Sequence, residues 1–159
     1  MITHTRIDYR LIHGQVITKW VKCANANKIV IIDDVLATDE FLGMVYKMAA
    51  PTGISVNIMS VDKAITLWEQ GKFDAGNTLL LFKTVDCALD TVKKGMNIKE
   101  LQVGGLENKP NRKVVFNQIT LDKIDGDKLT EIENMGIRVY FQTIPEEEPG
   151  SLQKMIKKL

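Results

Sequence analysis

The chain is poor in the residues that mark several classes of protein. Its two cysteines, Cys23 and Cys87, are too few and too far apart for a disulfide framework or a metal cluster. Lys and Arg number 21 against 20 for Asp and Glu, so the basic excess of a nucleic-acid-binding protein is missing. No apolar run approaches the roughly 20 residues that cross a bilayer, and no signal-peptide pattern opens the chain. We therefore expect a cytoplasmic protein with no nucleic-acid partner.

What is present fits one ordinary globular domain over residues 1–159, with 45% hydrophobic and 26% charged residues. The charge is unevenly spread. Residues 1–28 hold five basic side chains and one acid, Asp8, whereas residues 29–62 hold five acids and one lysine. The first segment either provides a local site for an anion or reflects chance clustering of surface charge, and composition favours neither.

Short apolar runs of strand length alternate with helical patterns along the whole chain. The pattern predicts strands at residues 2–8, 28–33, 54–60, 78–83, 101–103, 113–116 and 137–142. It predicts helices at residues 14–24, 38–50, 61–70, 85–94, 127–135 and from 152 to the end. Such alternation indicates an α/β fold with an open, mainly parallel sheet covered by helices on both faces. Ligands of such folds bind beyond the carboxyl ends of the strands, which makes the loop of residues 8–13 a candidate site.

That loop carries Asp8, Arg10 and His13 directly before the predicted helix at Gly14. A neutral imidazole keeps a lone pair on one nitrogen at pH 7 and is a nucleophile towards phosphorus. Arg10 offers a planar fork of donors for phosphate oxygens, and a helix start at Gly14 offers free backbone N–H groups. Asp8 would orient the imidazole or hold Arg10. The alternative for His13 is a residue that caps the helix or lies on the surface, and the alternative for Asp8 and Arg10 is a solvated ion pair. For His4, the other histidine, we favour a structural role.

Longer strings resemble one family. The segment RIDYRLIHGQVITKW is similar to the signature R-x-D-x-R-L-I-H-G-Q-V of the mannose/sorbose-family enzyme IIB subunits of the sugar phosphotransferase system. The segment IIDDVLATDEFLGMVYKMAAPTGISVNIMSVDKAI resembles a second block of that family, and VGGLENKP resembles its later Gly-Gly turn. Together these segments cover most of the chain in the expected order.

The resemblance implies a single-domain three-layer α/β/α sandwich in which His13 accepts and donates a phosphoryl group beside Asp8 and Arg10. It also makes Gly14 and Gln15 candidate phosphate-binding residues. The donor would be a histidine of a IIA domain, and the acceptor a sugar bound by membrane IIC and IID subunits. The chain would then attach to the inner face of the membrane through those subunits, with no cofactor and no metal. A homodimer is an open alternative, and the sugar is not specified.

Several other residues have two interpretations. Lys83, at the end of a predicted strand, would add positive charge to the phosphate site or simply end the strand. Gly104 and Gly105 would bring backbone close to the phosphate or form an ordinary turn. Asp33 and Asp34 would bind a divalent metal or enter a loop, and we favour the loop.

Tyr9 stands where many relatives carry another residue, often Asp, which would mark a different partner or sugar. The alternative function, from another class, is a regulatory module that keeps this fold and binds an anion or a protein without catalysis. Retention of both His13 and Arg10 favours the enzyme.

Overall fold

The computed structural model describes the backbone of residues 1–159 and all side chains except that of Ile17. Its main sheet has the order β3-β2-β4-β1-β5-β8-β9. The strands of this sheet are β1 (Ile2–Asp8), β2 (Lys28–Ile32), β3 (Ser55–Met59), β4 (Thr78–Phe82), β5 (Glu100–Gly105), β8 (Arg138–Phe141) and β9 (Gly150–Ser151). All pairings in it are parallel except that of β8 with β9. The predicted open, mainly parallel sheet is confirmed.

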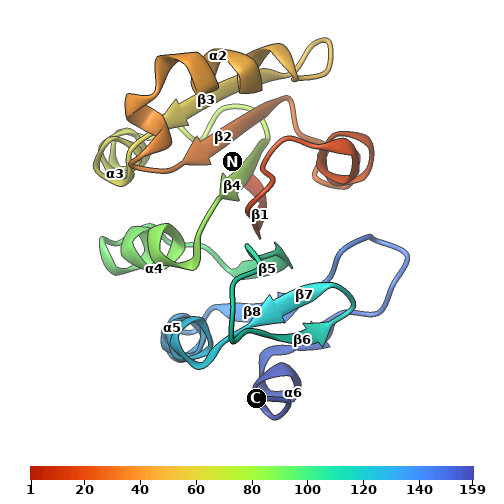
Figure 1. Ribbon diagram of the computed structural model, residues 1–159. Coiled ribbons are helices and arrows are strands. Elements are labelled where there is room, and N and C mark those ends of the chain that lie inside the picture. The colour runs from red at the N-terminus through yellow and green to blue at the C-terminus, as the bar shows by residue number, and fades with distance from the viewer.

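Helices cover both faces of this sheet (Figure 1). They are η1 (Val16–Trp20), a π-helical turn, followed by α1 (Val21–Cys23), η2 (Leu36–Thr38), α2 (Glu40–Met48), α3 (Val61–Glu69), α4 (Val85–Lys93), α5 (Lys123–Asn134) and α6 (Leu152–Ile156). In Figure 1, α3, α4 and α5 lie to the left of the sheet, the helix after β1 lies to its right, and α2 runs along the edge strand β3. The α/β/α layering is therefore confirmed as well.

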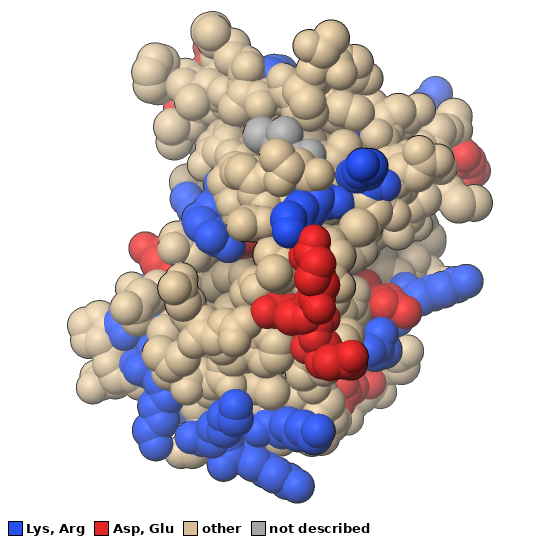
Figure 2. All heavy atoms as spheres, turned by 90° about the vertical axis from the view of Figure 1, so that its right-hand side faces the viewer, with Lys and Arg blue, Asp and Glu red and all other residues tan. Residues whose placement is uncertain are grey.

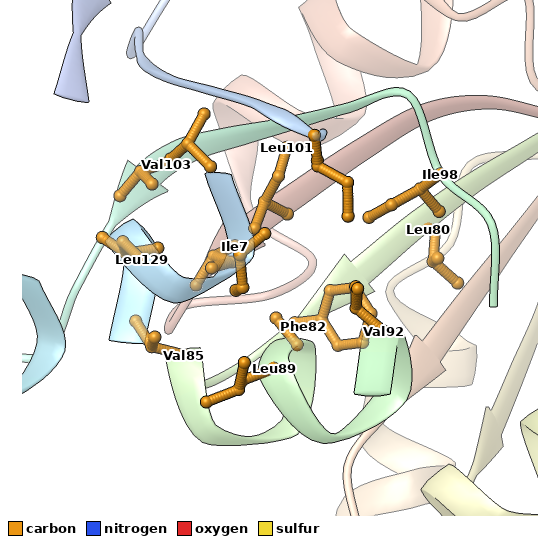
Figure 3. Close-up of a cluster of buried hydrophobic side chains, with 14 of the residues drawn as sticks. Ile7, Leu80, Phe82, Val85, Leu89, Val92, Ile98, Leu101, Val103 and Leu129 are labelled. Atoms are coloured by element: carbon orange, nitrogen blue, oxygen red, sulfur yellow. The ribbon is translucent and has the colours of Figure 1, made fainter. Parts of the chain in front are cut away.

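The larger core lies between the sheet and α3, α4 and α5. Figure 3 shows the central part, where Ile7 and Phe82 of adjacent strands meet Val85 and Leu89 of α4 and Leu129 of α5. All five side chains are buried, and such packing is the main favourable term in folding. A second core on the opposite face holds the turn and helix after β1 against the sheet.

Some predicted boundaries are wrong. Helix α5 begins four residues before the predicted residue 127, because Asp122 caps it by accepting a hydrogen bond from Asp125 N and Gly126 is tolerated inside it. Helix α2 begins two residues after the predicted residue 38, because Asp39 caps it by accepting a hydrogen bond from Leu42 N. The predicted strand at residues 113–116 pairs outside the main sheet, as β6 (Lys113–Phe116) in an antiparallel hairpin with β7 (Ile119–Leu121), a strand that the sequence pattern missed.

Within the described chain, no helix has both the length and the apolar character needed to cross a membrane. Residues 14–23 are helical, as predicted for residues 14–24, although the middle half of this segment, Val16–Trp20, is wound as a π-helix. The helix starts immediately after the loop that follows β1, so its first residues lie at the carboxyl edge of the parallel strands.

Candidate functional site

The loop between β1 and the following helix folds back on the end of the strand. Leu11 N donates to Asp8 O at 2.9 Å, and Tyr9 N donates to Gly105 O at 3.2 Å. Leu11 has a φ of 57°, an uncommon conformation for a residue with a side chain. Its side chain is fully buried in the second core, which holds the backbone in this turn. The turn brings His13 back over Asp8.

Asp8 is the centre of the site. Its carboxylate accepts six hydrogen bonds, and its side chain is fully buried. Arg6 donates from Nε and Nη2 to Oδ2 at 3.3 and 3.1 Å. Arg10 donates from its backbone N and from Nε to Oδ1, and from Nη2 to Oδ2, all at 3.0–3.1 Å. His13 Nε2 lies 2.9 Å from Oδ2.

These contacts keep Asp8 ionised. Burial alone would raise the pKa of its carboxyl, but the hydrogen bonds from His13 and Arg10 and the charge of Arg6 outweigh burial. The pKa of Asp8 therefore lies well below its usual range. A carboxylate can only accept hydrogen bonds, so the proton shared with His13 belongs to Nε2. We assign His13 the tautomer with a proton on Nε2 and a free lone pair on Nδ1.

His13 remains reachable from outside, since 18% of its side chain is exposed. The next residue, Gly14, has open space where a Cβ would stand, so a group attached to His13 could approach the backbone there. No side chain caps η1. Figure 2 views the side of the molecule that carries this helix and the loop of residues 142–149, where acidic and basic side chains lie against each other. Lys19 and Glu146 form one such ion pair between helix and loop.

A cleft of 460 Å³ opens beside the site. It is lined by Arg10, Gln15 and Gly105 together with Thr143 and Glu147 of the loop after β8. Arg10 is well placed for a ligand, because 40% of its side chain is exposed while Nε and Nη2 hold Asp8, which leaves Nη1 to bind an added group. Arg10 and Gln15 thus share a surface, whereas His13 lies next to it and not in its lining.

Lys83 is not brought to this cleft. Its backbone follows Phe82, whose Cα pairs with Ile7, so Lys83 begins beside the end of β1. It lines a separate, smaller cleft of 80 Å³ together with Arg112 and Asp125. A contribution of Lys83 to phosphate binding therefore stays a prediction.

Gly104 and Gly105 have a role that neither sequence interpretation described. Both lie in β5, and a Cβ on Gly104 would stand 1.9 Å from Arg6 Cζ. A Cβ on Gly105 would stand 3.0 Å from Asp8 Oδ1 and 3.3 Å from Arg10 Nη2. The two glycines make room for the charged groups of the site.

The acidic pair after β2 takes the structural role that we favoured. Asp33 Oδ1 accepts from Leu36 N at 2.8 Å, and Asp34 Oδ1 accepts from Val61 N at 2.8 Å. Each carboxylate therefore satisfies a backbone donor at the start of a helical segment. Among the side chains that the structure describes, no group of three potential metal ligands is found.

Arg6 and its partners are the part of the site that sequence reasoning missed. Arg6 stood in the quoted signature without a role, yet its guanidinium is fully buried against Asp8, Gln102 and the loop after β8. The available signal was a charged residue inside a predicted strand, two residues before Asp8 and therefore on the same face as Asp8. His4 lies on the same strand. Its ring stacks on that of Trp20 with 5.0 Å between the ring centroids, which agrees with the structural role that we expected.

A mainly parallel sheet with helices on both faces is the fold of solved sugar phosphotransferase IIB components. Residues 2–159 match the family described as PTS system sorbose subfamily IIB component, and the chain belongs to that family. It is 34% identical to the sorbose-specific EIIB component of Klebsiella pneumoniae, over 90% of this chain and 87% of that protein.

Two further relatives extend the comparison. The crystal structure of manxB from Thermoanaerobacter tengcongensis superposes with a TM-score of 0.92 at 38% identity, covering 99% of this chain and 96% of that one. The mannose-specific EIIAB component of Escherichia coli K12 is 27% identical over 97% of this chain, which matches 48% of that longer protein. The likeness therefore spans the whole fold.

Proposed function

We propose that His13 Nδ1 accepts a phosphoryl group from a phosphohistidine of a IIA component and passes it to a sugar during uptake. Family membership supports phosphotransferase chemistry in sugar transport and implies IIA and membrane IIC and IID components as partners. The observation that carries the assignment to His13 is its Nε2–H hydrogen bond to Asp8, which leaves Nδ1 as the nucleophilic nitrogen.

The geometry allows transfer without moving a proton on the ring. Nδ1 attacks phosphorus as the N–P bond of the donor breaks, and Nε2 keeps its proton throughout. The imidazole then becomes cationic, and the ionised Asp8 beside Nε2 stabilises that charge. In the second step a sugar hydroxyl attacks phosphorus as the N–P bond of His13 breaks. The electron pair of that bond returns to Nδ1, so His13 is neutral again, and the hydroxyl proton passes to water.

The charges of the site suit an added phosphoryl group. Arg6 and Arg10 together exceed Asp8 by one positive charge, and a phosphoryl group brings roughly two negative charges. Arg10 would bind the phosphate through its exposed edge, and Gly14 and Gln15 would add backbone and side-chain donors from the helix start. Phosphoryl transfer depends mainly on such positioning and charge compensation.

The IIA donor is the better supported of the two partners. In the mannose-specific EIIAB component of Escherichia coli, a IIA and a IIB unit are named in one protein, and this chain matches about half of it. The other proposals have less support than the IIA donor. They are the sugar substrate, the contact with IIC and IID, attachment to the membrane through these subunits, and the homodimer. A purely regulatory module has no support from the comparisons.

The test is phosphorylation of the purified chain by a phosphorylated IIA component. We expect one acid-labile phosphate per chain, mapped to His13 by mass spectrometry under alkaline conditions. His13→Asn should abolish the label, whereas His4→Gln, at the only other histidine, should retain it. A label on His4, Cys23 or Cys87 would refute the assignment.

A further inference from the structure

Arg6 is the most deeply buried charge next to the site. It lies on β1 two residues before Asp8, so the two side chains emerge on the same face of the sheet. Its side chain has no exposed surface and is the largest that is fully buried. A guanidinium in such a place is strongly unfavourable unless all its donors find partners, so its surroundings must be built around it.

The surroundings of Arg6 meet that requirement. Nε and Nη2 bind Asp8 Oδ2, and Nη1 donates to Gln102 Oε1 and to Gln142 O. Nη2 also lies 3.4 Å from Thr143 O. Gln102 is itself held, since its Nε2 donates to Gln142 Oε1 at 3.1 Å. The partners outside β1 come from β5, which pairs with β1, and from the two residues that follow β8, the next strand beyond β5.

The backbone of β5 confines the guanidinium from one side. A Cβ on Gly104 would lie 1.9 Å from Arg6 Cζ, 2.1 Å from Nη2 and 2.4 Å from Nε. The indole of Trp20 lies 5.2 Å from Cζ. Trp20 is in turn fixed by its Nε1–H, which donates to Thr143 O at 3.0 Å. The guanidinium of Arg6 therefore has no room to move towards a ligand that binds at the site.

We propose that Arg6 is a positioning residue that fixes Asp8 and, through Asp8, the orientation and tautomer of His13. Arg6 and His13 bind the same oxygen, Asp8 Oδ2. Because Arg6 is enclosed, it fixes the position of that oxygen, and the oxygen in turn fixes where His13 Nε2 binds. This inference rests on the proposed role of His13 as phosphoryl carrier, and it gives the site's two arginines different tasks.

Arg10 also binds Asp8, but it is half exposed and adjoins the open cleft. An incoming phosphoryl group will draw Arg10 towards it, which weakens the Arg10–Asp8 contact at the moment when the imidazole becomes cationic. Arg6 is enclosed and stays on Asp8. The carboxylate therefore keeps its position under Nε2 while Arg10 serves the phosphate.

The experiment changes Arg6 and its enclosure by separate routes. Arg6→Lys removes the fork of donors, Gly104→Ala drives the guanidinium from its place, and Gln102→Met removes one acceptor while keeping the volume. Arg112→Lys is the matched control. Arg112 is also almost fully buried and paired, with Asp122 and Asp125, but it lies in the hairpin region away from His13.

Two readouts separate positioning from stability. The first is the ¹⁵N NMR spectrum of the His13 imidazole in the unphosphorylated protein, which reports which nitrogen carries the proton. The second is the rate of phosphorylation by IIA. We expect a mixed tautomer and a rate about 10- to 100-fold lower in Arg6→Lys and Gly104→Ala, by analogy with the loss of a carboxylate partner that orients a metal-bound histidine. Gln102→Met should change both in the same direction but less, and Arg112→Lys should lower the melting temperature alone.

The inference is overturned if the variants keep the wild-type tautomer and rate, or if Arg112→Lys alters the tautomer equally. Should Arg6→Lys fail to fold, Gln102→Met and Gly104→Ala give the decision. Absence of phosphate on His13 in the wild type would refute the proposed function and leave the NMR test of Arg6 standing, so the two failures are distinguishable.

Discussion

Replacing Asp8 by Asn tests the centre of the site with a change of one charge and almost no volume. The carboxylate accepts from Arg6, Arg10 and His13, and each of these groups is a donor. An amide offers one oxygen and turns an NH₂ group towards the remaining donors. Asp8→Asn therefore leaves part of this donor set unpaired in a place that water does not reach.

The loss of stability follows mainly from Arg6. Removing one partner of a fully buried ion pair destabilises a protein by about 3–5 kcal/mol, because the other charge remains buried without compensation. Arg10 contributes less, since its side chain is partly exposed and can turn to solvent. We expect about 3–5 kcal/mol at pH 7, measured by urea unfolding. Asp127→Asn, at an exposed acid paired with Lys123, is the control and should change stability by less than about 0.5 kcal/mol.

The difference between wild type and Asp8→Asn should depend on pH. Folding lowers the pKa of Asp8, so its stabilising effect is complete above the unfolded-state pKa of about 3.9 and declines as the pH falls towards the lower folded-state pKa. At pH 3 the gap should be about 1 kcal/mol smaller than at pH 7. A gap that stays constant down to pH 3 would contradict the ionised, low-pKa Asp8 of our account.

Asp8→Asn should also slow phosphorylation of His13. The amide can donate to Nε2 and thereby favour a proton on Nδ1, which removes the nucleophilic lone pair. In a serine protease the corresponding change of tautomer costs about 10⁴-fold in rate, and we expect at least about 100-fold here. A folded Asp8→Asn protein that accepts phosphate at the wild-type rate would refute the assignment of Nδ1.

Three further predictions concern Arg10, the need for a metal in the transfer step, and the cap of helix α3. Arg10→Ala should slow transfer from IIA about ten- to a hundredfold with little change in melting temperature, because this arginine is partly exposed; equal losses in both would indicate a structural arginine. A chelator should leave transfer from phosphorylated IIA to His13 unchanged in a stopped assay, provided that the magnesium-dependent upstream step is complete; loss of transfer would require Asp33 and Asp34 to be reconsidered as a metal site. Ser60→Ala should lower the free energy of unfolding by about 1 kcal/mol, since Ser60 caps α3 through Lys63 N, and an unchanged urea midpoint would show that the cap is not stabilising.

Local patterns in the sequence were sufficient for most of the fold. Dense β-branched runs such as residues 28–33 predicted buried parallel strands. Helices α3, α4 and α5 each end two residues before a glycine with a positive φ, at Gly71, Gly95 and Gly136. Errors arose where local preference and tertiary packing disagree. The helix predicted at residue 127 in fact begins at Lys123 and contains Gly126, where an added Cβ would make only ordinary contacts with Leu121 and Leu159.

By itself the sequence determined the fold class and the loop that carries His13, Asp8 and Arg10, because these depend on spacing within one short segment and on periodicities of two and 3.6 residues. Only the tertiary structure decided how that segment works. Arg6 meets Gln102 and Gln142 across the sheet, and Gly104 leaves the space that its guanidinium occupies. These contacts join residues about 100 and more positions apart. In our proposal they also select the reactive nitrogen of His13, since the position of a buried carboxylate depends on every donor that surrounds it.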